Sequence, residues 1–158
     1  MIQRIQTAYL GVSIILLSIV TFGTSLFSFI GETSRYTFSS YGITEYALEN
    51  GALIDQKSYP FYLGTIALAL LCFICLMSYK NLLRQFKLGR TVFFLYFLMV
   101  VSVVLLSLYG DAFIDEESKG REMGLGFLLF VAGFPFVFLA NTGIKRDKNL
   151  IASLDRLR

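Results

Sequence analysis

Apolar residues fall into four long runs that contain no Asp, Glu, Lys, Arg or His, separated by segments rich in charge. The runs hold 23, 19, 20 and 22 residues and cover Ala8–Ile30, Phe61–Tyr79, Thr91–Gly110 and Met123–Ile144. An α-helix of such length reaches roughly 30 Å, about the thickness of the hydrocarbon core of a bilayer. Lipid offers no partner for exposed backbone N–H and C=O groups, so each run is expected to be helical. The pattern predicts an all-α membrane protein, a four-helix transmembrane bundle in a single domain of residues 1–158.

Composition removes the main alternatives to this prediction. The chain has only 158 residues and is 56% hydrophobic, which leaves little polar chain in which four such runs could be buried. A membrane β-barrel would show short segments of alternating polarity, whereas these runs are continuous.

Lys and Arg are distributed unevenly between the two sets of connecting segments. The N-terminus, Lys80–Arg90 and Lys145–Arg158 together hold ten Lys and Arg against two Asp, a net charge of +8. Gly31–Pro60 and Asp111–Glu122 hold four against nine acidic residues, a net charge of −5. The positive-inside rule therefore places both termini in the cytoplasm. The first run has no signal-peptidase-like site after it, so we expect an uncleaved anchor.

The segment Lys80–Arg90 is the densest basic stretch, and we interpret it as a cytoplasmic loop. Its cations are expected to contact anionic lipid headgroups, with a specific phosphate or partner site as the alternative. The net charge of +3 is thus a sign of topology, and no nucleic-acid partner is predicted. The candidate headgroup contacts are Lys80, Arg84, Lys87 and Arg90.

The outer loop, residues 31–60, is too long to be a plain connection and is rich in Ser, Thr, Tyr and Gly. Tyr46–Ile54 predicts a β-hairpin around Asn50-Gly51, the favoured pair of a type I′ turn. Arg35–Tyr41 predicts a further strand because Tyr, Thr and Phe favour strands. We expect a small sheet of two or three strands on the outer helix ends.

Two sets of residues are candidate contacts for a protein partner. Aromatic residues of the outer loop could bind a partner, or could form the core of the small sheet or an interfacial aromatic belt. Apolar residues of the tail, residues 145–158, form an amphipathic stripe that could lie on the inner membrane surface or dock on a partner. The two sets are Tyr36, Phe38, Tyr41 and Tyr46, and Leu150, Ile151, Leu154 and Leu157.

Small residues and one proline within the runs indicate where helices pack closely. Gly11 in the first run and Gly126 and Gly133 in the last would let neighbouring helices approach one another. Pro135 lies within the last run and is expected to bend its helix, because it lacks a backbone N–H.

The sequence offers little catalytic chemistry, and no catalytic, cofactor-binding or metal site is predicted. The chain has no His, which excludes His-based acid–base catalysis and His metal ligands. Cys72 and Cys75 have a redox spacing, but apolar surroundings disfavour the reactive thiolate and no second pair could relay electrons. The acidic cluster of Asp111, Asp115, Glu116 and Glu117 matches no calcium-loop spacing.

Both ends of the chain resemble a known family. The opening MIQRIQTAYL and the closing LANTGIKRDKNLIASLDRLR are similar to the terminal segments of a bacteroidetes-type family of four-span integral membrane proteins of unknown function. The resemblance implies an inner-membrane location and supplies no activity, substrate or site residue.

From these observations we expect a non-enzymatic accessory or scaffolding subunit of a larger inner-membrane complex, in contact with membrane lipids and protein partners. A small oligomeric transporter or channel is the first alternative. A membrane thiol–quinone oxidoreductase that uses Cys72 and Cys75 is the second.

Overall fold

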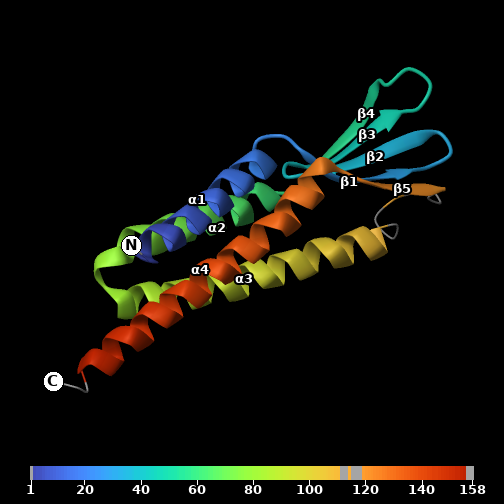
Figure 1. The fold of residues 1–158 in the computed structure, drawn as a ribbon. Helices are drawn as coiled ribbons and strands as arrows, with labels where there is room; N and C mark the ends of the chain where they lie inside the picture. Colours follow the sequence, from blue (N-terminus) through green and yellow to red (C-terminus); the bar gives the residue numbers. More distant parts are fainter. Residues whose placement is uncertain (1, 111–113, 115–118, 156–158) are drawn as a thin grey trace.

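A computed structural model describes residues 2–110, 114 and 119–155 of the chain. Four helices run side by side, and a β-sheet stands at one end of them (Figure 1). The start of α1 and the end of α4 lie at the opposite end (Figure 1). In chain order the elements are α1 (Ile2–Thr21), β1 (Ser25–Ile30), β2 (Ser34–Ser39), β3 (Gly42–Ala47), β4 (Leu53–Ser58), α2 (Phe61–Met77), the 3-10 turn η1 (Ser78–Lys80), α3 (Leu82–Tyr109), β5 (Gly120–Met123) and α4 (Leu125–Asp155).

The β-sheet is larger than predicted, and it overturns the expectation of an all-α protein with a small hairpin. Five antiparallel strands pair in the order β4-β3-β2-β1-β5. Strand β5 comes from the segment between α3 and α4, so the sheet joins two parts of the chain that were predicted to be separate. The protein is therefore a mixed structure, with helices at one end and an antiparallel sheet at the other.

The first apolar run divides into a helix and a strand. Helix α1 ends at Thr21, and Ser25–Ile30 pairs with β2 on one side and β5 on the other. Gly23 lies at the break with φ +140°, a conformation that favours glycine. Strands buried on both faces are continuously apolar, so the apolar character of this segment did not distinguish a strand from a helix.

The chain reverses at Asn50-Gly51, but the turn is not the predicted type I′. That turn needs positive φ at both central residues, whereas only Gly51 is positive, at +65°. Four residues lie between the paired Ala47 and Ala52, and the Asn50 side chain accepts a hydrogen bond from the Ala52 N–H at 3.0 Å. The predicted strand Arg35–Tyr41 corresponds to β2, Ser34–Ser39.

Among the described residues, three helical segments are long and apolar enough to cross a membrane: Phe61–Lys80, Leu82–Tyr109 and Leu125–Ile151. The apolar part of α1, Ile5–Thr21, is shorter. Two helices extend beyond the apolar runs into segments that the sequence analysis took as a loop and a tail. The supposed basic loop is the 3-10 turn η1 followed by the first turns of α3, capped by Asn81, whose side chain accepts from the Arg84 N–H at 3.2 Å. The tail continues α4 without a break as far as Asp155.

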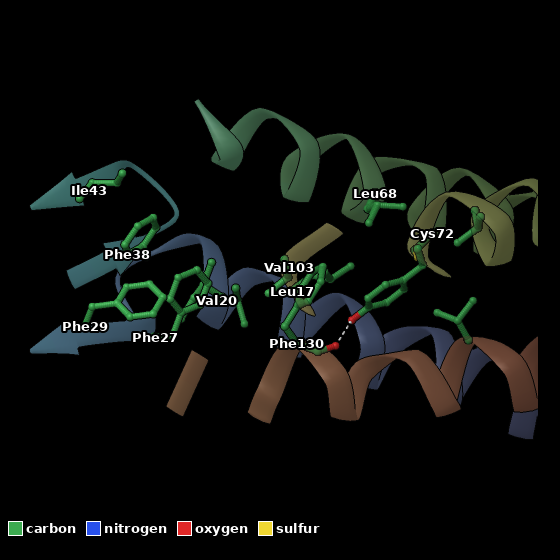
Figure 2. Close-up of a cluster of buried hydrophobic side chains, with 14 of the residues drawn as sticks. Leu17, Val20, Phe27, Phe29, Phe38, Ile43, Leu68, Cys72, Val103 and Phe130 are labelled. Atoms are coloured by element: carbon green, nitrogen blue, oxygen red, sulfur yellow. Dashed lines mark hydrogen bonds between the residues drawn. The ribbon is translucent and has the colours of Figure 1, made fainter. Parts of the chain in front are cut away.

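The main core lies where the sheet meets the helices (Figure 2). One face of the sheet carries aromatic rings, with Phe27 stacked on Phe38 at 4.5 Å between ring centroids and Phe29 edge-on to both. These rings join Leu17 and Val103 of the helices in a single buried cluster. Ser28, Thr37 and Thr44 share the other face, so the sheet is amphipathic and directs its apolar face toward the helix ends.

Candidate functional site

The predicted aromatic contacts of the outer loop divide into buried and exposed residues. Tyr36 and Phe38 are buried in the sheet's own core, where the Tyr36 hydroxyl donates to Glu45 at 3.2 Å. Tyr41 is 43% exposed, and its ring lies 5.5 Å from that of Tyr62 at the junction between the sheet and α2. Tyr46 is partly exposed on the polar face of the sheet. Only Tyr41 and Tyr46 of the four are thus accessible to a partner.

The two edges of the sheet differ in what they present. Strand β5 is short, and its Glu122 forms an ion pair with Arg35 of β2 at 2.5 Å. Strand β4 is longer, lies at the edge of the sheet beside β3, and is exposed at all six positions. Its Leu53 and Ile54 are 57% and 55% exposed. The sequence did not predict that this strand lies at the edge of the sheet, because the pattern located the turn but gave no information on the order of the strands.

The four candidate headgroup contacts all lie at the surface of η1 and the first turns of α3. Each is exposed, and the Arg90 guanidinium lies over the Phe86 ring at 5.7 Å. The Lys148 ammonium of α4 approaches the same ring at 4.5 Å, which brings the basic parts of both helices together. Lys80, Arg84, Lys87 and Arg90 form this surface.

The tail candidates fall on the last turns of α4. Leu150 and Ile151 are each 47% exposed. The side chain of Leu154 and the whole of Leu157 lie outside the described residues, as do the acidic residues Asp111, Asp115, Glu116 and Glu117. Residues 145–155 of the tail are helical and continue α4, so both predicted roles, contact with the membrane surface and docking on a partner, stay predictions.

The candidate packing positions are not equivalent. A Cβ at Gly133 would lie 2.1 Å from the Tyr96 hydroxyl oxygen, and one at Gly126 would lie 2.7 Å from the Ser25 carbonyl oxygen, so both positions require glycine. Gly11 has open space around it, so the close packing expected there is absent. Pro135 lies exposed within α4, which runs past it to Asp155.

Cys72 and Cys75 are both buried free thiols on α2. The Cys75 thiol donates to the Gln85 carbonyl oxygen at 3.6 Å. Within the described residues, no group of three or more His, Cys, Asp or Glu side chains could hold a metal ion.

Buried polar contacts between helices were missed by the sequence analysis. The Gln6 amide of α1 donates to the Asp147 carboxylate of α4 at 2.6 Å, and Asp147 is only 8% exposed. Its second oxygen, Oδ1, has no partner among the described residues. The Thr21 hydroxyl of α1 donates to that of Thr65 of α2 at 2.7 Å. These pairs hold α1 to its neighbours at both of its ends.

Comparisons with known proteins add one finding. No curated protein matches this chain. A family model, described as a domain of unknown function, DUF4293, matches residues 2–157, nearly the whole chain. The predicted membership in an uncharacterised family is thereby confirmed, while its phylum and number of spans stay predictions. The chain belongs to the DUF4293 family.

Proposed function

We propose that this protein is a non-enzymatic accessory or scaffolding subunit of a larger complex in the bacterial inner membrane. Its outer sheet would pair with a protein partner, and its helices would contact membrane lipids. The proposal rests on the outer surface of the helices, the distribution of charge, and the open edge of the sheet.

The outer surfaces of the helices support residence in the membrane. Large apolar side chains face outward on α2, α3 and α4, such as Leu70 at 56%, Leu98 at 62% and Leu128 at 57% exposure. Water-soluble proteins rarely expose apolar surface so extensively, whereas hydrocarbon tolerates it. Helix α1 packs against α4 and α2, and its 20 residues reach about 30 Å, so we infer that it crosses the membrane with them.

Charge and geometry together support the orientation. The basic start of α3 and the Lys145–Lys148 turn of α4 lie at the end of the helices opposite the sheet (Figure 1). This grouping matches the positive-inside rule with four crossings, both termini in the cytoplasm and the sheet outside.

The observation that carries the proposal is the edge strand β4. An open edge presents unpaired N–H and C=O groups, and natural proteins usually shorten, cover or charge such edges. Strand β4 is partly protected, because the Asp55 carboxylate accepts from the Gln56 N–H at 2.8 Å and the pairing with β3 shifts register at Ile54, yet it leaves Leu53 and Ile54 exposed. A partner that adds a strand here would gain backbone hydrogen bonds and cover both apolar side chains.

The absence of His from the sequence supports a non-enzymatic role, as does the burial of the cysteine pair. A thiol–quinone enzyme would need Cys72 and Cys75 accessible to its substrate. Replacing both by Ala should therefore leave the recovery of partners unchanged.

The test compares two variants on the same hairpin. Ile54→Lys charges the strand edge, whereas Leu48→Lys charges a turn residue that is similarly exposed, at 46%. Tagged native protein is crosslinked in the membrane, purified in mild detergent and analysed by mass spectrometry. We expect a stoichiometric partner with crosslinks to β4 in the wild type and in Leu48→Lys, reduced about tenfold or more in Ile54→Lys. A protein that runs alone or only as a homo-oligomer, or equal recovery in both variants, would contradict the proposal.

A further inference from the structure

A cavity of about 300 Å³ lies between the apolar face of the sheet and the outer ends of the helices. The sheet contributes Phe27, Phe38 and Ile43, and α2 and α3 contribute Phe61 and Val103. Figure 2 shows Phe27, Phe38 and Ile43 on the strands and Val103 on the helix side of the same buried cluster. The cavity therefore lies at the junction between the sheet and the helices.

The chemistry of the cavity lining restricts what could occupy it. The lining is almost wholly apolar, and none of its described residues carries a charge. Water is stable in a cavity only where polar groups can hydrogen-bond to it. A hydrocarbon group suits the lining, and a volume of this order lies at the lower end of small-ligand sites.

The position of the cavity indicates the source of that hydrocarbon. Two lining residues also reach the surface: Leu106 of α3 is 36% exposed, and Tyr59, just before α2, is 53% exposed. Tyr109, three residues after Leu106 on α3, is also exposed, at a level where hydrocarbon of the outer leaflet would contact a transmembrane helix. The cavity thus opens onto apolar surface at the outer boundary of the membrane.

Aromatic residues lie close to this opening. Tyr59 borders the cavity, and the Tyr41–Tyr62 pair lies at the same junction between the sheet and α2. Tyrosines concentrate at the level of lipid headgroups, because their rings are apolar and their hydroxyl groups are polar. A lipid with its headgroup at this level would have its chain beside the opening.

We propose that this cavity binds one acyl chain of a membrane phospholipid from the outer leaflet. The headgroup stays at the aromatic rim, and the chain enters between the sheet and α3. This inference requires that the protein is in the membrane, but it does not depend on a protein partner at β4.

The test uses a phospholipid with a photoreactive diazirine near the end of one acyl chain, in nanodiscs that contain the purified full chain. Val103→Phe enlarges a buried lining residue into the cavity. Leu105→Phe adds the same aromatic ring to the outward surface of α3, where the side chain is 48% exposed, and serves as the matched control. Val103→Ala enlarges the cavity.

We expect crosslinks to the lining segments around Ile43 and Phe61 in the wild type, in Leu105→Phe and in Val103→Ala. They should fall about tenfold in Val103→Phe, because expelling even a pair of methylene groups from an apolar site changes binding by that order. Equal crosslinking in Val103→Phe and Leu105→Phe would overturn the proposal. So would extraction of a free fatty acid or an isoprenoid, and no phospholipid, from protein purified in mild detergent. Failure of Val103→Phe to fold leaves the comparison of Val103→Ala with wild type, where loss of the crosslinks would also overturn it.

Discussion

Tyr96 is fully buried at the centre of the helices, and its hydroxyl donates to the Phe130 carbonyl of α4 at 2.9 Å. The Ser13 hydroxyl of α1 lies 3.3 Å from the Gly133 carbonyl of the same helix. Side chains from two helices thus bind backbone oxygens of α4 just before Pro135. The proline lacks the N–H that would otherwise bond to the Val131 carbonyl four residues earlier, so the bonds to the Phe130 and Gly133 carbonyls do not replace that one and instead link α4 to its neighbouring helices beside the proline.

Gly133→Ala should lower the free energy of unfolding by about 1–3 kcal/mol, because the added methyl group would overlap the Tyr96 hydroxyl oxygen. Tyr96→Phe alone should cost about 1 kcal/mol for the lost hydrogen bond. In the double variant, alanine at position 133 should cost less than it does alone, since the overlapping atom is gone. Thermal unfolding in detergent, followed by a fluorogenic maleimide that reacts with the buried Cys72 and Cys75 on exposure, measures all three. Additive effects would contradict the contact.

Asp147→Ala should destabilise the protein by about 1–3 kcal/mol, because it leaves the buried Gln6 amide without its acceptor. Asp147→Asn keeps an acceptor oxygen and removes a buried charge, so its cost should be clearly smaller. The same maleimide assay compares the two. An Asn variant as unstable as the Ala variant would mean that the carboxylate charge, rather than the hydrogen bond, holds α1 to α4.

At the scale of elements, Gly42 determines how closely β3 and β4 approach. It has φ +143°, and a Cβ there would lie 2.2 Å from the Lys57 carbonyl oxygen of β4. Gly51, in the turn of the same hairpin, also has positive φ but open space around it. Substitutions at the two glycines can therefore be compared: both would strain the backbone, but only the one at Gly42 would also bring a side chain against the neighbouring strand.

Gly42→Ala should separate β4 from β3 and lower the free energy of unfolding by about 1–3 kcal/mol. Gly51→Ala should cost about 1 kcal/mol and leave the pairing intact. Trypsin cleavage after Lys57 in nanodisc-held protein reports the difference, since a released β4 becomes a better substrate. Similar cleavage rates in the two variants would show that the close contact at Gly42 does not determine whether β4 stays paired with β3.

Element boundaries also show what the sequence could and could not predict. The apolar character of Phe61–Tyr79 and Thr91–Gly110 was sufficient to place helices there, because length and composition decide that question locally. Ser25–Ile30 is equally apolar, yet it forms a strand because β2 and β5 lie on both sides of it, which no local pattern records. Strand β5 is short and polar, so only its pairing with β1 reveals it.

The candidate site was predictable to a lesser degree. A hairpin near Asn50-Gly51 followed from turn chemistry, but the exposed edge of β4 follows from strand order, which depends on long-range pairing. In the sequence, Asp147 was counted only among the charges of the tail, residues 145–158. It continues the buried positions Val137, Ala140 and Ile144 at intervals of three and four residues, and this periodicity could have identified it.

At the scale of the whole molecule, the orientation can be tested with single cysteines in a Cys72→Ala, Cys75→Ala background. Gln56→Cys lies in the exposed strand β4 and Asn149→Cys lies near the end of α4, both at exposed positions. A membrane-impermeant maleimide should label the first on intact cells, after removal of any outer barrier, and the second only after permeabilisation. Labelling of both on intact cells would place them on the same side of the membrane, which requires an even number of crossings between them and contradicts the three (α2, α3 and α4) of the proposed topology.

The strand order has a consequence for the synthesis of this protein. Strand β1 is an inner strand, but its neighbour β5 follows α3 in the chain, so β1 to β4 are translated well before β5. Because chains fold progressively from the N-terminus during synthesis, a four-stranded meander with one edge of β1 open is expected to form first. That edge stays open until α3 has been synthesised and Gly120–Met123 has paired with it. In the proposed topology, completion of the sheet would therefore report, on the outer side of the membrane, that α3 has crossed it.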